Sequence, residues 1–160
     1  MSAPSLRSVV PDDQPFLTAM LYEAFFVPPG AEPFPLDIVD EPGIVEYHDR
    51  FGSRPGDVGV VVTVDGERVG AAWVRSIRGY GFVDDRTPEL TIAVVAGRRG
   101  QGIGEALLAA LLERVPRCSL SCDRRNPAMR LYERHGFAIV TTDGEHSVVM
   151  VRDETAERRG

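Results

Sequence analysis

Lysine is absent from this sequence, and its 18 strongly basic residues are all arginine. A Walker A loop binds nucleotide phosphates through a lysine beside its last glycine, so that class of nucleotide site is excluded. Positive charge is also scarce, because 24 acidic residues leave a formal net charge of −6. Contact with a phosphate backbone needs a basic face, so we expect no nucleic-acid partner and favour a neutral or cationic small molecule.

The sequence also lacks the marks of membrane insertion, secretion and metal binding. No apolar run approaches the roughly 18 residues that span a membrane, and the N-terminal stretch MSAPSLRSVVPDDQ has no apolar signal-peptide centre. We therefore expect a cytoplasmic protein with no membrane partner. The three histidines and two cysteines do not have zinc-ligand spacing, so no metal site is expected.

The two cysteines are expected to stay reduced. Cys118 and Cys122 share one predicted strand, where a rise of about 3.3 Å per residue separates them by about 13 Å. A disulfide requires Cα atoms within about 7 Å, so these two cannot bond to each other. Free cysteines are most often buried structural residues.

Hydrophobic periodicity divides the chain into short strands and helices in an irregular order. Strands are predicted over residues 5–10, 57–64, 67–77, 89–95, 117–122, 137–140 and 147–151. Helices are predicted over residues 11–26, 44–52, 103–115 and 126–136. Asp65-Gly66 and Asp143-Gly144 are favoured hairpin turns. We predict an α/β (α+β) chain with a mixed, mostly antiparallel sheet of about six or seven strands and about four helices.

No internal repeat or linker divides the chain, so we predict a single domain over residues 1–152 and a charged tail over 153–160. Five of the twelve prolines fall within residues 27–43, which predicts an irregular loop. Aromatic residues near this loop are expected to divide between the core and a cleft. They are Tyr22, Phe25, Phe26, Trp73 and Tyr80.

Glycines gather where a helix should begin, in the segment AGRRGQGIGE at residues 96–105. Glycine weakens helices, so this placement needs another reason. A helix that starts here, directly after a strand, presents unpaired backbone N–H groups and the positive end of its dipole. Glycines let an anion approach those groups closely, so the segment predicts a bound phosphate or pyrophosphate.

Other glycine-rich motifs fit this segment less well. A dinucleotide fingerprint needs a third glycine at position 105, which is Glu105. The GRRG at 97–100 matches a G-x-x-G nucleic-acid loop, an alternative that the acidic charge opposes. The remaining pattern, Arg99-x-x-Gly102-x-Gly104, resembles the acetyl-CoA pyrophosphate loop of the GNAT family of N-acetyltransferases. NPAMRLYERHGF at 126–137 is similar to that family's second hallmark, and the resemblance covers nearly the whole chain.

This resemblance implies the GNAT fold and an N-acetyltransferase activity. The enzyme would transfer an acetyl group from acetyl-CoA, without a metal, to a primary amine of an unidentified small-molecule or protein acceptor, by direct attack in a ternary complex. The strand at 89–95 would splay from its neighbour and pair its backbone with the pantetheine arm. Tyr132 would protonate the CoA sulfur, and Glu89 would act as a general base. The implied cofactor-binding residues are Ile92, Ala93, Val94, Arg99, Gly100, Gln101, Gly102, Ile103, Gly104, Glu105 and Asn126.

Each assigned residue also has a structural interpretation. Tyr132 fits the apolar face of its predicted helix, and Glu89 fits a solvated strand end. Asn126 either contacts the cofactor or only caps its helix. Arg99 either contacts a phosphate or braces the turn.

Alternative interpretations also exist for two histidines and for the function of the whole protein. His48 either lines the acceptor pocket or lies on a surface helix, and His135 suits the negative end of a helix dipole. A non-catalytic acyl-CoA-binding or sensor module would keep the glycine loop without needing Glu89 or Tyr132. Exposed strand edges in such a fold allow a homodimer.

Overall fold

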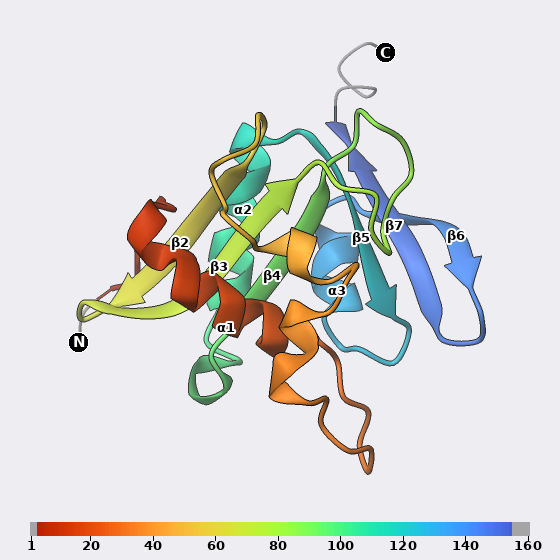
Figure 1. The fold of residues 1–160 in the computed structure, drawn as a ribbon, viewed down its shortest axis with the longest axis horizontal. Coiled ribbons are helices and arrows are strands. Elements are labelled where there is room, and N and C mark those ends of the chain that lie inside the picture. Colours follow the sequence, from red (N-terminus) through yellow and green to blue (C-terminus); the bar gives the residue numbers. More distant parts are fainter. Residues whose placement is uncertain (1–2, 155–160) are drawn as a thin grey trace.

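The computed structural model describes residues 3–154, and its centre is a seven-stranded sheet in the order β1-β2-β3-β4-β5-β7-β6 (Figure 1). The strands are β1 Ser5–Ser8, β2 Val58–Val64, β3 Glu67–Arg75, β4 Glu89–Val94, β5 Arg117–Asp123, β6 Ala138–Asp143 and β7 Ser147–Asp153. The α-helices are α1 Gln14–Ala24, α2 Ile103–Arg114 and α3 Met129–Arg134. Single 3-10 turns occur at Pro11–Asp13, Leu36–Asp40, Val45–Tyr47 and Ala96–Arg98.

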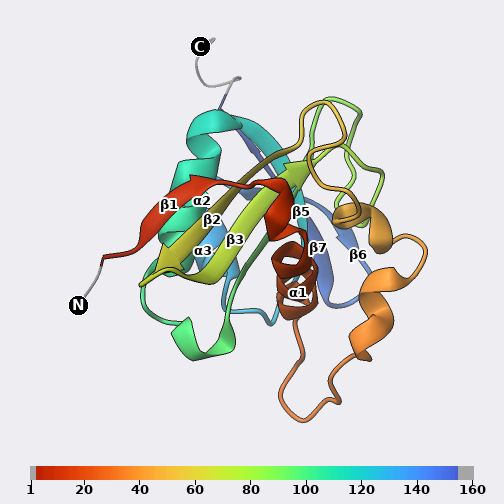
Figure 2. The same cartoon turned by 60° about the vertical axis from the view of Figure 1, so that its left-hand side comes forward.

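Neighbouring strands pair antiparallel except for β4 with β5, which confirms the predicted mixed, mostly antiparallel sheet. Helix α1 covers one face of the sheet, and α2 and α3 cover the other (Figure 2). Successive strand residues therefore enter different cores. Ala71 and Trp73 of β3 pack with Leu17 of α1, whereas Ala72 and Val74 pack with α2.

Local turn chemistry produces both predicted hairpins. Asp65 and Gly66 have φ angles of 52° and 82°, the left-handed pair that a tight turn between β2 and β3 requires. Gly144, with φ 72°, begins the turn over residues 144–146 that joins β6 to β7, and Asp143 is the last residue of β6. Strand β7 runs to Asp153, so it includes the first residue of the segment predicted as a tail. Most of that segment, residues 155–160, lies outside the described residues.

The helix predicted over 44–52 is instead one 3-10 turn at Val45–Tyr47. The physical reason is the buried Arg75 of β3, which donates hydrogen bonds to the carbonyls of Glu46, Asp49 and Arg50 at 2.7 to 3.0 Å. Of these carbonyls, that of Glu46 would accept from the amide of Arg50 in a helix over 44–52, and it accepts from Arg75 instead. Arg50 itself has a left-handed φ of 50°, which is incompatible with a helix at that position.

Strands β4 and β5 form the opening that matters for function. Their parallel pairing is limited to Glu89 opposite Ser119, and they diverge from that point (Figure 1). The carbonyl of Pro88 accepts from the amide of Ser119, so even-numbered residues of β4 direct their backbone groups toward β5. The backbone groups of Ile92 and Val94 therefore face a gap between the two strands.

Candidate active site

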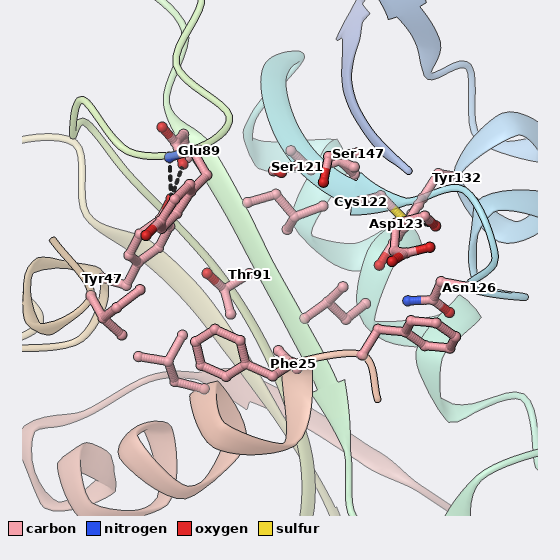
Figure 3. A pocket seen from close by; sticks show the side chains of 18 of the residues that line it. Phe25, Tyr47, Glu89, Thr91, Ser121, Cys122, Asp123, Asn126, Tyr132 and Ser147 are labelled. Atoms are coloured by element: carbon pink, nitrogen blue, oxygen red, sulfur yellow. Dashed lines mark hydrogen bonds between the residues drawn. The ribbon is translucent and has the colours of Figure 1, made fainter. Parts of the chain in front are cut away.

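A cavity of about 400 Å³ opens where β4 and β5 diverge. Of the predicted site residues, Glu89, Ile92, Asn126 and Tyr132 line it. Figure 3 shows Glu89 and Tyr47 on one side and Cys122, Asp123, Asn126 and Tyr132 on the other, with Thr91 and Phe25 between them. The remaining lining residues are Leu21, Ala24, Phe26, Phe34, Ile44, Tyr80, Leu90, Leu120, Ser121 and Ser147.

The Glu89 carboxylate is buried at the narrow end of this opening, with 2% of the residue exposed. Tyr47 donates its hydroxyl to Oε2 at 2.6 Å, and the amide of Gly79 donates to Oε1 at 2.8 Å. The amide of Gly81 also donates to the carboxylate. Burial raises the pKa of Glu89 above its ordinary value, and the three donors oppose that rise. Glu89 is therefore not the solvated strand end that its position in the sequence allowed.

The segment Gly79-Tyr80-Gly81 folds tightly over Glu89 because its glycines permit it. A Cβ atom on Gly79 would collide with the Tyr47 hydroxyl, and one on Gly81 would lie 2.9 Å from the Leu120 carbonyl carbon. The amide of Tyr80 donates to the Tyr47 hydroxyl at 2.8 Å. Sequence analysis did not find Tyr47, Gly79 or Gly81 as site residues. The sequence Gly79-Tyr80-Gly81 could have indicated this site, since two closely spaced glycines allow the backbone to approach other groups closely.

Tyr132 of α3 packs in the core and also lines the cavity. The residue is 8% exposed, belongs to the α2 core and stacks edge-on against Phe137 with ring centroids 5.9 Å apart. It also lines the cavity, and its hydroxyl has no hydrogen-bond partner among residues 3–154. Burial first, and the neighbouring Cys122 second, raise the pKa of the phenol, so it stays protonated at neutral pH.

Asn126 has a structural role at the start of the turn that leads into α3. Its Oδ1 accepts a hydrogen bond from the amide of Ala128 at 2.9 Å, as an Asx-type turn does. The α-helix itself begins at Met129, and Gly136 ends it with φ 91°, as the sequence predicts. Asn126 also lines the cavity, so capping does not remove it from the site.

The glycine segment begins α2 in a form suited to an anion. Gly100 and Gly102 have φ angles of 79° and 80°, and Gly102 is the N-cap of α2 without any side-chain capping bond. The first intrahelical bond runs from Ala106 to Gly102, so within the described chain the three amides at 103–105 have no acceptor. Added Cβ atoms at Gly100 and Gly102 would meet nothing within 4 Å. Open space and free N–H donors together fit a pyrophosphate.

The charged residues around this segment are engaged with other elements. Arg99 pairs with Glu23 of α1 at 3.1 Å and donates to the carbonyl of Val94 at 3.4 Å, so it braces the turn in this structure. Glu105 forms an ion pair with Arg134 at 3.6 Å, and its Oε1 lies 3.4 Å from Nε2 of His135, so it contacts α3 and the residue that follows it. These residues lie outside the cavity lining.

The other predicted cofactor-binding residues divide between the α2 start and the strands. Ile103 is buried in the α2 core, and Gln101 is exposed. Gly104 faces α3, where a Cβ atom added to it would lie 3.6 Å from the Leu131 side chain. The amide of Val95 donates to the Val69 carbonyl, so odd-numbered residues of this stretch, Ala93 included, direct their backbone groups toward β3 and away from the gap. The gap itself is lined by Ile92.

His48 occupies neither of its two expected positions. The residue is buried, its Nδ1 lies 2.8 Å from the Thr18 hydroxyl, and its Nε2 lies 2.9 Å from the Val39 carbonyl. It ties the proline-rich loop to α1 and does not line the cavity. Among the aromatic residues, Trp73 is fully buried, whereas Phe25, Phe26 and Tyr80 line the cavity.

The cysteine prediction is confirmed, since Cys118 and Cys122 are both free and buried. Burial raises the pKa of their thiols to about 12 and about 11, respectively, with Asp123 adding to the rise at Cys122. The Cys122 thiol, which lines the cavity, is therefore protonated and weakly reactive.

A sequence profile described as the acetyltransferase (GNAT) domain matches residues 55–139, which is more than half of the chain. The chain belongs to the GNAT family. It is therefore an acyl-CoA-dependent N-acetyltransferase, and the predicted family and enzyme class are confirmed. A comparison with curated proteins gave no significant match.

Solved structures with the GNAT fold superpose on nearly the whole chain. The acetyltransferase of the GNAT family from Streptococcus pneumoniae has 17% identity and a TM-score of 0.67, covering 94% of this chain and 98% of its own. The PaiA N-acetyltransferase from Thermoplasma acidophilum, solved with coenzyme A, has 16% identity and a TM-score of 0.66, covering 94% and 99%. The ribosomal-protein-alanine N-acetyltransferase from Brucella melitensis has 23% identity and a TM-score of 0.64, covering 93% and 99%. At these identities the likeness establishes the fold.

Residues 3–154 contain neither a membrane-spanning helix nor a cluster of metal ligands. No helix within residues 3–154 has the length and apolar character needed to cross a membrane. The same span holds no group of three or more His, Cys, Asp or Glu side chains arranged to bind a metal ion.

Proposed function

We propose that this GNAT enzyme transfers an acetyl group from acetyl-CoA to a primary amine by direct attack in a ternary complex. One observation carries the proposal: a single opening between β4 and β5 has free strand backbone at its wide end and a buried carboxylate, Glu89, at its narrow end. The wide end suits an extended arm that adds to a strand edge, and the carboxylate suits the acceptor.

Binding of the co-substrate is proposed to use backbone groups of this chain. The free amides at the start of α2 would hold the pyrophosphate, and the backbone of Ile92 and Val94 would hold the pantetheine arm. Acetyl-CoA supplies the thioester that the amine attacks. Arg99 would have to exchange its ion pair with Glu23 for a phosphate oxygen, which is a small rearrangement because both side chains are partly exposed.

Glu89 is proposed to accept a proton from the ammonium group of the acceptor, directly or through one water, which leaves the neutral amine that attacks the thioester. A carboxylate has about four lone-pair positions, and three donors leave one for this transfer. A pKa raised by burial brings the base closer to the working pH, which favours proton transfer. Tyr132, neutral and with a free hydroxyl on the opposite wall, is proposed to protonate the departing sulfur.

Titration calorimetry with coenzyme A and a thiol-release assay with amines test this proposal together. Saturable binding of coenzyme A, with amine-dependent release of free thiol, is the expected result. Binding without release across a broad amine panel would support the non-catalytic sensor module instead. A flat calorimetric titration on folded protein would contradict the cofactor assignment itself.

Tyr132→Phe is expected to lower kcat about tenfold at pH 7 and to leave the dissociation constant of coenzyme A unchanged. The loss is moderate because a thiolate with a pKa near about 8.5 leaves without much help from an acid. The effect should therefore shrink as the pH rises through 8.5. Steady-state kinetics between pH 6.5 and 9.5 provide the measurement, and an undiminished kcat at pH 7 would return Tyr132 to a purely structural role.

Tyr47→Phe is expected to move the acidic limb of the kcat/KM profile to higher pH. The Tyr47 hydroxyl stabilises the charged form of Glu89, so its removal raises the pKa of that carboxyl further. Activity should fall about three- to tenfold at pH 7 and return to the wild-type level at pH 9, where the base is ionised in both proteins. A uniform loss at every pH would indicate a structural defect, with the urea unfolding midpoint as the control.

A further inference from the structure

The end of the cavity near Glu89, where the acceptor would bind, is lined mainly by apolar side chains. Beyond Glu89, its surface is built from the end of α1 and the segment that follows it, which contribute Leu21, Phe25, Phe26, Phe34 and Ile44. Tyr47 and Tyr80, which meet at the Tyr47 hydroxyl beside Glu89, also line the cavity. This wall is almost entirely aromatic and aliphatic.

Several contacts hold this aromatic wall in place. The rings of Phe25 and Phe34 pack with centroids 5.3 Å apart. The Tyr22 hydroxyl donates to the Phe34 carbonyl at 2.6 Å, which fixes the proline-rich segment against α1. Phe34 and Tyr80 remain 40% and 67% exposed, so both rings offer surface that a ligand can cover.

The charges of the cavity have one sign. Its charged lining residues are the carboxylates Glu89 and Asp123, and no arginine or histidine among the described residues lines it. Arg125 pairs with Asp123 through two hydrogen bonds of 2.7 and 2.9 Å, and this pairing lowers the pKa of Asp123 to about 2. The arginine is thus already engaged, and an anion in the cavity would find no free cationic partner.

We propose that the acceptor is a small primary amine carried on an aromatic or branched apolar body, with no carboxylate beside the amine. The proposal rests on the proposed transfer function. The ammonium group of the acceptor approaches Glu89. The rings of Phe34 and Tyr80 cover the apolar body of the acceptor, and the negative faces of these rings also favour a nearby cation. A cavity of about 400 Å³, part of which the pantetheine arm would occupy, leaves room for roughly one ring.

The matching exclusion follows from the same charges. An α-carboxylate on the acceptor would lose its water in a site that already holds Glu89, without gaining a cation. Sites that leave a buried polar group unpaired discriminate by large factors. We therefore expect 2-phenylethylamine to exceed phenylalanine in kcat/KM by at least about 100-fold, although the two share the same ring and amine.

The experiment follows thiol release with 2-phenylethylamine, phenylalanine, spermidine and a short peptide that begins with phenylalanine. Binding of each amine to the coenzyme A complex is measured by calorimetry. In Phe34→Ala, the KM for 2-phenylethylamine should rise about five- to tenfold, with little change in kcat. Leu36→Ala is the matched control, because Leu36 is 78% exposed in the same segment and does not line the cavity.

Each outcome decides between the two proposals. Faster transfer to phenylalanine, spermidine or the peptide would overturn the acceptor class and leave the transferase proposal intact. An unchanged KM in Phe34→Ala would also overturn it. Binding of 2-phenylethylamine that depends on Phe34, without transfer to any amine, would support the acceptor site and count against the transfer function. Failure to bind 2-phenylethylamine at all would overturn the acceptor class.

Discussion

Glu89→Gln should lower kcat/KM about 100- to 1000-fold at pH 7, a loss typical of removing a general base. An alkyl ammonium group has a pKa near about 10.4, so little free amine exists at pH 7 without proton removal. The carboxylate is buried, carries a raised pKa and keeps one lone-pair position free beside its three donors. It is the group best placed to take that proton.

The glutamine substitution preserves most of the surrounding contacts. Its carbonyl oxygen can face the amide of Gly79, while its NH2 group donates to the Tyr47 hydroxyl, which can rotate and accept. The segment over Glu89 should therefore stay folded, and circular dichroism with urea unfolding will verify this. Glu67→Gln, at the exposed start of β3, is the matched control and should keep the wild-type rate.

The pH dependence separates a base from a structural residue. With Glu89→Gln the rate should rise steadily with pH until the amine itself loses its proton, because the enzyme must then wait for free amine in solution. The ratio between wild type and variant should fall below about tenfold near pH 10. A rate within threefold of wild type at pH 7, with an unchanged profile, would place the base elsewhere.

Features set by neighbouring residues were predictable from the sequence. The Asp65-Gly66 hairpin, the strand–turn–helix around Gly102 and the glycine that ends α3 all follow from turn and cap chemistry within a few positions. The order of strands in the sheet was not predicted, since periodicity alone does not choose which strands pair.

Features set by distant residues were not predictable. Glu89 became a buried carboxylate because Tyr47, more than forty positions earlier, and the segment at 79–81 meet over the end of β4. Arg75 likewise takes the Glu46 carbonyl that the predicted helix at 44–52 would have used. His48 was misplaced for the same reason, because its partners Thr18 and Val39 belong to other elements. Tertiary hydrogen bonds override local pattern at each of these positions.

Gly102→Val should weaken coenzyme A binding at least about 100-fold. Gly102 has φ 80° at the N-cap of α2, a conformation that a β-branched residue adopts only with strain. The valine would either shift the turn and misalign the free amides at 103–105, or project its methyl groups into the open space in front of them. Both routes remove the diphosphate contacts, and calorimetry with coenzyme A measures the loss.

Two further variants make this result specific to the anion site. Gly97→Ala lies in the preceding 3-10 turn, where an added Cβ meets nothing within 4 Å and φ is ordinary, so its affinity should equal that of wild type. Gly104→Ala places a methyl group 3.6 Å from Leu131, an ordinary contact that keeps α2 folded but adds a side chain beside the free amides at 103–105. Its affinity should fall by an intermediate amount. A phosphate site on this turn predicts that affinity for coenzyme A falls in the order Gly97→Ala, Gly104→Ala, Gly102→Val. Equal affinity in all three variants would mean that the amides at the start of α2 hold no phosphate.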